Sequence, residues 1–241
     1  DTVFNVSPGT SKSSILSILS NAWVWARMPS ARIMTFSHTA DLVFDLSNKS
    51  RHVIKSAEYR RLFPEIVIKA DTDSKGYFAN TLGGDRYTCT VAGKSPMGFH
   101  AHIQIGDDPI DPKKASSEAE RRNAKDFFDA VLPGRMVDKT VTAMFLVMQR
   151  LTEDDPTGYL LVKAKREGAT KIRHICLPAL VTDPKVRAMV SPPELVEEYY
   201  RDGRAGLMDP VRLPHSVLKE RMADGLYSFA GQYLQSPVSP G

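Results

Sequence analysis

The chain has 241 residues, 42% of them hydrophobic, so it can bury the core of one or two domains. Its 32 basic and 28 acidic residues leave a net charge of only +4, which permits a polyanionic partner without requiring one. The apolar runs are shorter than the ~18 residues of a membrane span, the N-terminus lacks a signal-peptide pattern, and Cys89 and Cys176 lack metal-ligand spacing. We therefore expect an intracellular protein with two reduced thiols.

The first part of the chain has the rhythm of a parallel sheet. The predicted elements are a strand at 3–6, a helix at 13–28, a strand at 31–36 and a helix from Thr39 to about Lys55. Strand, loop, helix and strand in this order form the βαβ pattern. A β-hairpin over 77–91, turning at Gly83 and Gly84, then interrupts it.

The rest of the chain continues the alternation of strands and helices. The predicted elements are a strand at 101–107, a helix from Ser117 to about Leu132, strands at 141–148 and 171–177, and helices at 191–200 and 214–223. The strand at 141–148 is almost continuously apolar, which is typical of a parallel sheet covered on both faces. We therefore expect an α/β fold in which helices cover both faces of a mostly parallel sheet. The composition of residues 236–241 is that of a linker.

A phosphate-loop-like turn joins the first strand to the first helix. It can offer backbone N–H groups, an ammonium and hydroxyls to phosphates, from Pro8, Gly9, Thr10, Ser11, Lys12, Ser13 and Ser14. The full pattern has glycines six residues and one residue before the lysine, where this chain has Val6 and Ser11. Taken alone, the segment therefore fits a plain strand-to-helix turn as well as it fits phosphate binding.

Two adjacent carboxylates, Asp107 and Asp108, end a buried strand before Pro109. Such neighbours repel each other, so a cation or hydrogen bonds should compensate them. We assign Asp107 to a Mg²⁺ ion and Asp108 to the water that attacks a γ-phosphate. The alternative is that Asp-Pro only begins a turn. Together with the loop, the two acids indicate a site of nucleoside-triphosphate hydrolysis.

Gln149 and Arg150 end the next apolar strand, so we expect them in the same crevice at the carboxyl edge of the sheet. A polar pair there can sense the γ-phosphate; the alternative is strand-end polarity that merely meets solvent. His100 and His102 lack a third metal ligand and are expected to be structural. The two tryptophans at 23 and 25 are expected in the core.

In this order, the segments resemble the large terminase subunits of tailed bacteriophages, the motors that package viral DNA. The resemblance is carried by the loop at 7–13, the stretches 32–42 and 59–64 ("YRxLFP"), the acidic segment 98–109, and 148–158, which is close to "QRxxxDDxxG". The stretch 229–237 has the rhythm of the segment that closes the ATPase domain, so the resemblance extends nearly from end to end.

The resemblance implies a RecA-like P-loop NTPase fold with an additional strand, in which ATP hydrolysis drives double-stranded DNA into a procapsid. The implied cofactors are ATP and Mg²⁺. Lys12 and Ser13 would meet the β- and γ-phosphates and the metal. Asp107 would be the metal-side acid and Asp108 the catalytic carboxylate, while Gln149 and Arg150 would form the coupling motif.

The implied assembly is a ring of copies on a portal protein, with a small terminase subunit, in the host cytoplasm and not at a membrane. Residues 1–235 would be an ATPase domain lacking its N-terminal edge, and 236–241 the start of a linker toward an absent nuclease domain. Ser11 in place of glycine is expected to weaken nucleotide binding, and Arg135 and Arg150 remain as candidate arginine fingers. The rival interpretations are a related DNA helicase or repair ATPase, and a non-hydrolysing module that docks onto DNA or a portal.

Overall fold

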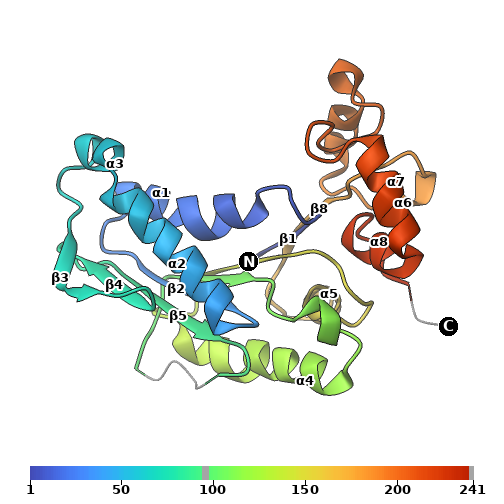
Figure 1. Ribbon diagram of the computed structural model, residues 1–241. Coiled ribbons are helices and arrows are strands. Elements are labelled where there is room, and N and C mark those ends of the chain that lie inside the picture. The colour runs from blue at the N-terminus through green and yellow to red at the C-terminus, as the bar shows by residue number, and fades with distance from the viewer. Residues whose placement is uncertain (94–97, 239–241) are drawn as a thin grey trace. The chain divides into compact units, whose positions relative to one another are not determined.

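The computed structural model describes residues 1–93 and 98–238 (Figure 1). The chain divides into two compact units. The first unit comprises Asp1–Lys12, Pro112–Arg121 and Leu146–Gly241, and the second comprises Ser13–Asp111 and Arg122–Phe145. Of the expected linker, residues 239–241 lie outside the described residues.

The described strands form an eight-stranded sheet, as predicted for an α/β fold. They are β1 (Thr2–Val6), β2 (Arg32–Ser37), β3 (Ile68–Asp73), β4 (Tyr77–Asn80), β5 (Asp85–Thr90), β6 (Ile103–Asp107), β7 (Ala143–Met148) and β8 (Arg173–Leu177). Their order is β3-β4-β5-β2-β6-β7-β1-β8. β2 pairs in parallel with β5 and β6, and β1 with β8, whereas β3–β4 and β4–β5 are antiparallel.

The helices of the described residues are α1 (Ser20–Arg27), α2 (Ala40–Lys55), α3 (Ala57–Leu62), α4 (Glu118–Asp126), α5 (Pro156–Lys163), α6 (Pro184–Arg187), α7 (His215–Asp224) and α8 (Leu226–Gln232). Two π-helical segments, η1 (Ser14–Leu19) and η3 (Phe127–Val131), accompany them, with 3₁₀ turns η2 (Pro112–Lys114), η4 (Leu132–Arg135), η5 (Pro193–Tyr199) and η6 (Arg201–Gly203). None of these helices is long and apolar enough to cross a membrane.

Three predicted helices differ from the observed ones. The helix expected from Ser117 to about Leu132 is α-helical only from Glu118 to Asp126 and continues as the π-segment η3. The helix expected over 13–28 begins as the π-segment η1 and becomes α-helical only at Ser20. The helix expected over 191–200 is the 3₁₀ helix η5, because the amides of Leu195 and Tyr200 bond three residues back, to Pro192 and Glu197.

In the second unit, helical segments pack against both faces of β2. Successive strand residues point to opposite faces of a sheet. Ile33 lies in the cluster that contains Trp25 of α1 and Ile54 of α2. Phe36 faces the other way, with its ring centroid 5.0 Å from that of Phe127 in η3. The predicted covering of both faces is therefore confirmed, and Figure 1 shows α2 and the segment after α4 on opposite sides of β2 and β5.

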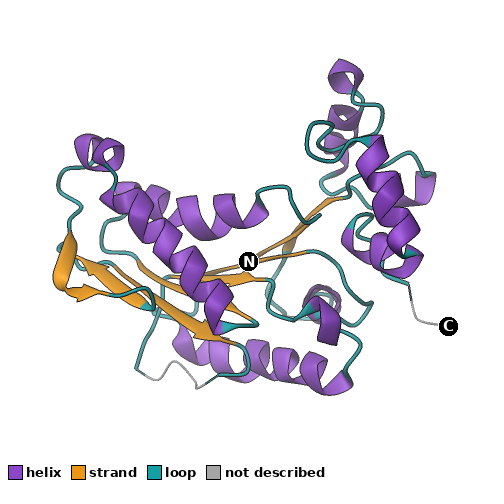
Figure 2. Ribbon diagram, in the orientation of Figure 1, coloured by secondary structure: helices purple, strands orange, loops and turns teal. Residues whose placement is uncertain are grey.

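The predicted hairpin is formed by β4 and β5 (Figure 2). Its turn requires glycine at position 84, because a Cβ there would lie 2.1 Å from the carbonyl oxygen of Pro29. β3, which was not predicted, pairs with β4 at the edge of the sheet. Its mostly polar sequence gave no apolar signal, and ion pairs from Arg51 and Lys55 to Asp73 hold it to α2.

The expectation for the two tryptophans is half wrong. Trp25 is fully buried and donates from Nε1 to the carbonyl of Ala31 at 3.0 Å, but Trp23 is 65% exposed. Trp23 follows Ile15 and Leu19 at intervals of four residues. Together with residues of β6 and β7, the three side chains line an apolar groove of about 390 Å³. A helix-period pattern identifies an apolar stripe, but it does not say whether that stripe is covered.

Candidate active site

The phosphate-loop-like turn follows β1 and is closed by a short internal bond, from Thr10 Oγ1 to the carbonyl of Ser7 at 2.6 Å. Gly9 and Ser11 have φ angles of 78° and 62°. Left-handed backbone is easy for glycine and costs another residue about 1–2 kcal/mol. Ser11 therefore has a left-handed backbone at the position where the full pattern has glycine.

In the second unit, the residue after Lys12 meets the acidic strand end. Ser13 Oγ donates to Asp107 Oδ1 at 2.9 Å, and Ser17 Oγ donates to Asp107 Oδ2. Asp107 is fully buried at the end of β6. The structure thus brings together the two side chains that the sequence assigned to a metal.

Asp108 has a left-handed backbone, with φ of 44°, which is uncommon outside glycine. Its carbonyl accepts from the hydroxyl of Ser37 and the amide of His38, both at 3.3 Å. Nδ1 of His38 lies 2.7 Å from the same oxygen, so Nδ1 must carry the proton. Strained backbone of this kind is frequent where a side chain must be presented for chemistry.

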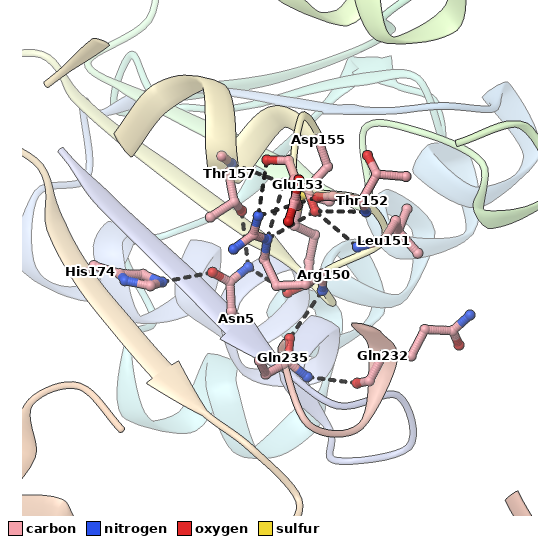
Figure 3. A network of polar contacts seen from close by, with 12 residues as sticks. Asn5, Arg150, Leu151, Thr152, Glu153, Asp155, Thr157, His174, Gln232 and Gln235 are labelled. Atoms are coloured by element: carbon pink, nitrogen blue, oxygen red, sulfur yellow. Dashed lines mark hydrogen bonds and ion pairs between the residues drawn. The ribbon is translucent and has the colours of Figure 1, made fainter. Parts of the chain in front are cut away.

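Asp155 organises the loop that follows β7 (Figure 3). Its fully buried carboxylate accepts from Arg150 Nε at 2.9 and 3.1 Å, and from the amides of Leu151 and Gly158 at 2.9 Å each. It thereby caps the N-terminus of α5. A Cβ on Gly158 would lie 1.8 Å from the carbonyl oxygen of Glu153. These contacts explain the spacing of arginine, aspartate and glycine in this motif.

Gln149 and Arg150 are not strand-end residues that merely meet solvent. Gln149 is only 6% exposed. Besides its bonds to Asp155, Arg150 donates from Nη2 to the carbonyls of Thr152 and Glu153, at 3.2 and 3.3 Å. The guanidinium is therefore held within its own loop.

Gln235 joins this loop to the phosphate-loop-like turn after β1, and it was not predicted. Its Oε1 accepts from the amide of Arg150 at 3.0 Å, and its Nε2 donates to Ser7 Oγ at 3.4 Å and to the Gln232 carbonyl at 2.6 Å. The side chain is fully buried and is labelled in Figure 3. The sequence indicated only that the stretch 229–237 closes the domain.

A second buried polar side chain, that of Asn5, links several elements of the first unit. Asn5 of β1 donates from Nδ2 to the Met148 carbonyl at 3.2 Å and to Thr157 Oγ1 at 2.9 Å. Its Oδ1 lies 2.7 Å from Nε2 of His174, on β8. Burial, together with the charge of Arg150, lowers the pKa of His174 to about 4. The imidazole is therefore neutral at pH 7 and donates from Nε2 to Asn5.

The predicted site residues are distributed over both units. The first unit contains Pro8, Gly9, Thr10, Ser11, Lys12, Gln149 and Arg150, and the second contains Ser13, Ser14, Asp107 and Asp108. The described residues contain no cluster of three or more His, Cys, Asp or Glu side chains suited to a metal ion. A single carboxylate with a hydroxyl fits Mg²⁺, which in nucleotide sites takes one or two carboxylates plus substrate phosphates.

No sequence-family model matches the chain, and no curated protein matches it. Among solved structures, it is similar to the HK97 bacteriophage large terminase, with a TM-score of 0.61, 12% identity and 98% of this chain covered. It spans 47% of that terminase chain. The Thermus phage P74-26 large terminase ATPase domain aligns with a TM-score of 0.59 and 9% identity, over 98% of this chain and 88% of that one.

A variant of the P74-26 domain gives nearly the same result, with a TM-score of 0.58. These neighbours are RecA-like P-loop folds, so the predicted fold class is confirmed. The resemblance to large terminases is likewise confirmed at the level of the fold.

Proposed function

We propose that this chain is the motor ATPase domain of a large terminase, which hydrolyses ATP to drive double-stranded DNA into a procapsid. The observation that carries the proposal is the bond between Ser13 and Asp107, which joins the residue after a left-handed phosphate loop to the acidic end of β6. The fold of the structural neighbours supports it, since they are terminase ATPase domains.

In the proposed site, the backbone amides from Gly9 to Ser14 and the ammonium of Lys12 bind the β- and γ-phosphates. Ser13 and Asp107 hold Mg²⁺, which would neutralise charge on the phosphate oxygens. Asp108 orients the attacking water and accepts its proton. Convergence of the Lys12 amine with the two carboxylates remains a prediction of this assignment.

Gln149 and Arg150 are proposed to form the coupling motif, which senses whether the γ-phosphate is present and transmits its loss to the rest of the domain. Because the guanidinium of Arg150 is bound to Asp155 and to two carbonyls, we assign it to shaping the loop rather than to touching the nucleotide. The proposed partners are a portal protein, a small terminase subunit, DNA and further copies of the chain in a ring, in the host cytoplasm.

The assignment of the catalytic carboxylate is tested by Asp108→Asn. We expect ATP turnover in the presence of Mg²⁺ to fall by roughly 10²-fold or more, because the amide cannot accept the proton. Lys12→Ala should also reduce turnover severely, through loss of phosphate contacts. Asp45→Asn, at an exposed position on α2, is the matched control and should keep the wild-type rate. Unchanged turnover in Asp108→Asn would remove the assignment.

A further inference from the structure

We propose that Ser17 and Arg86 are positioning residues for the metal-side carboxylate, and that they act through the chain of contacts Arg86–Ser17–Asp107. This inference rests on the proposed function, since it concerns how Asp107 is held for a divalent cation. All three residues belong to the second unit.

The side chain of Arg86 is fully buried although two of its nitrogen donors lack hydrogen-bond partners within the described residues. It extends from β5, is fully buried, and donates from Nη2 to the carbonyl of Ser17 at 2.8 Å. Its Nε and Nη1 atoms have no hydrogen-bond partner within the described residues. Burial lowers the pKa of Arg86 to about 9, and the charge of Asp107 acts to raise it. At neutral pH the group is therefore a buried cation, which a core would not need for packing alone.

The contact from Arg86 reaches the π-helical segment that follows the phosphate loop. In η1, hydrogen bonds span five residues, as from the amide of Ser20 to the carbonyl of Ile15. π-Helical turns are rare and are often found at functional sites. The guanidinium holds this segment through the Ser17 carbonyl, while the Ser17 hydroxyl holds Asp107.

As a result, each carboxylate oxygen of Asp107 accepts a hydrogen bond from a serine hydroxyl of η1 or of its N-cap residue. Ser13 donates to Oδ1 and Ser17 to Oδ2. Ser13 is expected to turn its oxygen to the ion, whereas Ser17 keeps the carboxylate oriented from the opposite oxygen. Groups that orient a metal ligand in this way typically change metal affinity about 10- to 100-fold when they are removed.

The first test is Ser17→Ala, with Mn²⁺ as the probe. Binding of Mn²⁺ to the protein with ATP is measured by electron paramagnetic resonance, and ATP binding without metal is measured in EDTA. We expect the affinity for Mn²⁺ to fall about 10-fold while metal-free ATP binding is unchanged. Ser17→Thr keeps a hydroxyl and should recover most of the affinity. Ser20→Ala is the matched control, since the Ser20 hydroxyl donates to the Leu16 carbonyl within the same helical segment.

The second test is Arg86→Met, which separates positioning from a merely structural role. A structural arginine would give a lower melting temperature and an unchanged affinity for Mn²⁺. A positioning arginine gives weaker Mn²⁺ binding whatever the change in melting temperature, because the substitution removes the bond to the Ser17 carbonyl and, with it, the support of the hydroxyl that holds Asp107. Wild-type Mn²⁺ affinity in both Ser17→Ala and Arg86→Met would overturn the inference. Failure of the wild-type protein to bind Mn²⁺ with ATP would instead refute the proposed function.

Discussion

A single carboxylate holds the loop that follows β7. Asp155 is fully buried, and it accepts from one guanidinium, from the backbone amide of Leu151 and from that of Gly158 in the first turn of α5. Breaking a buried ion pair by removing one partner is costly, because the other charge stays in the interior without compensation.

We therefore expect Asp155→Ala to lower the free energy of unfolding by about 3 kcal/mol, as measured by urea denaturation. Asp154→Asn changes the adjacent, exposed aspartate and should stay within about 0.5 kcal/mol of the wild type. A loss below about 1 kcal/mol in Asp155→Ala would mean that Arg150 finds another partner or reaches water.

Individual residues also show what a sequence can and cannot predict. Ser11 was identified as a departure from the phosphate-loop pattern, but its left-handed backbone becomes visible only in the structure. Ser17 could have been found, since four residues after Ser13 is the same face of a helix. Arg86 could not, because its reach to η1 depends on how strands distant in sequence are ordered in the sheet.

At the scale of the elements, the hydrogen bond between Asn5 of β1 and His174 of β8 makes stability depend on pH. The pKa of His174 is about 4 in the folded chain and 6.5 ordinarily. The unfolded state therefore binds more protons between these values. It follows that the free energy of unfolding rises with pH across this window and falls as the pH is lowered from 6.5 to 4.

Urea denaturation at several pH values should show this loss, with a slope below the ~1.4 kcal/mol per pH unit of one full proton. His174→Gln should flatten the dependence between pH 4 and 6.5. The exposed His52 provides the control, and His52→Gln should leave the slope as in the wild type. Equal slopes in all three proteins would show that His174 is not the group responsible.

Elements with strong local signals were predicted well. The apolar runs marked β1, β2 and β7, and the two glycines marked the turn between β4 and β5. β3 was missed because tertiary pairing, not its own composition, makes it a strand. The π-helical start of the first helix was also missed, since no residue pattern distinguishes it from an α-helix.

For the whole molecule, the order of short motifs indicated the fold, whereas overall sequence similarity to known proteins is very low. Neighbours with 9–12% identity align over 98% of the chain, while no family model matches. Core positions tolerate many apolar side chains of suitable size, so a fold can persist without a shared sequence. The resemblance was carried instead by a few short segments in a fixed order along the chain, such as 98–109 and 148–158.

The proposed motor function predicts DNA contacts that are mainly to phosphates, and the net charge of +4 permits them. The logarithm of the affinity for a duplex, measured by fluorescence anisotropy, should fall linearly with the logarithm of salt concentration between 50 and about 200 mM. A duplex of scrambled sequence should bind equally well. Affinity that survives high salt, or that prefers one duplex, would contradict this expectation.

The bond from Gln235 to Ser7 has a consequence for synthesis of the protein. The two residues are separated by 228 positions, so the phosphate loop leaves the ribosome long before its partner does. A nascent chain that stops short of residue 235 carries the loop but not the side chain that fastens it to the Arg150 amide. The phosphate-loop-like turn is thus synthesised well before the side chain that completes its hydrogen bonds.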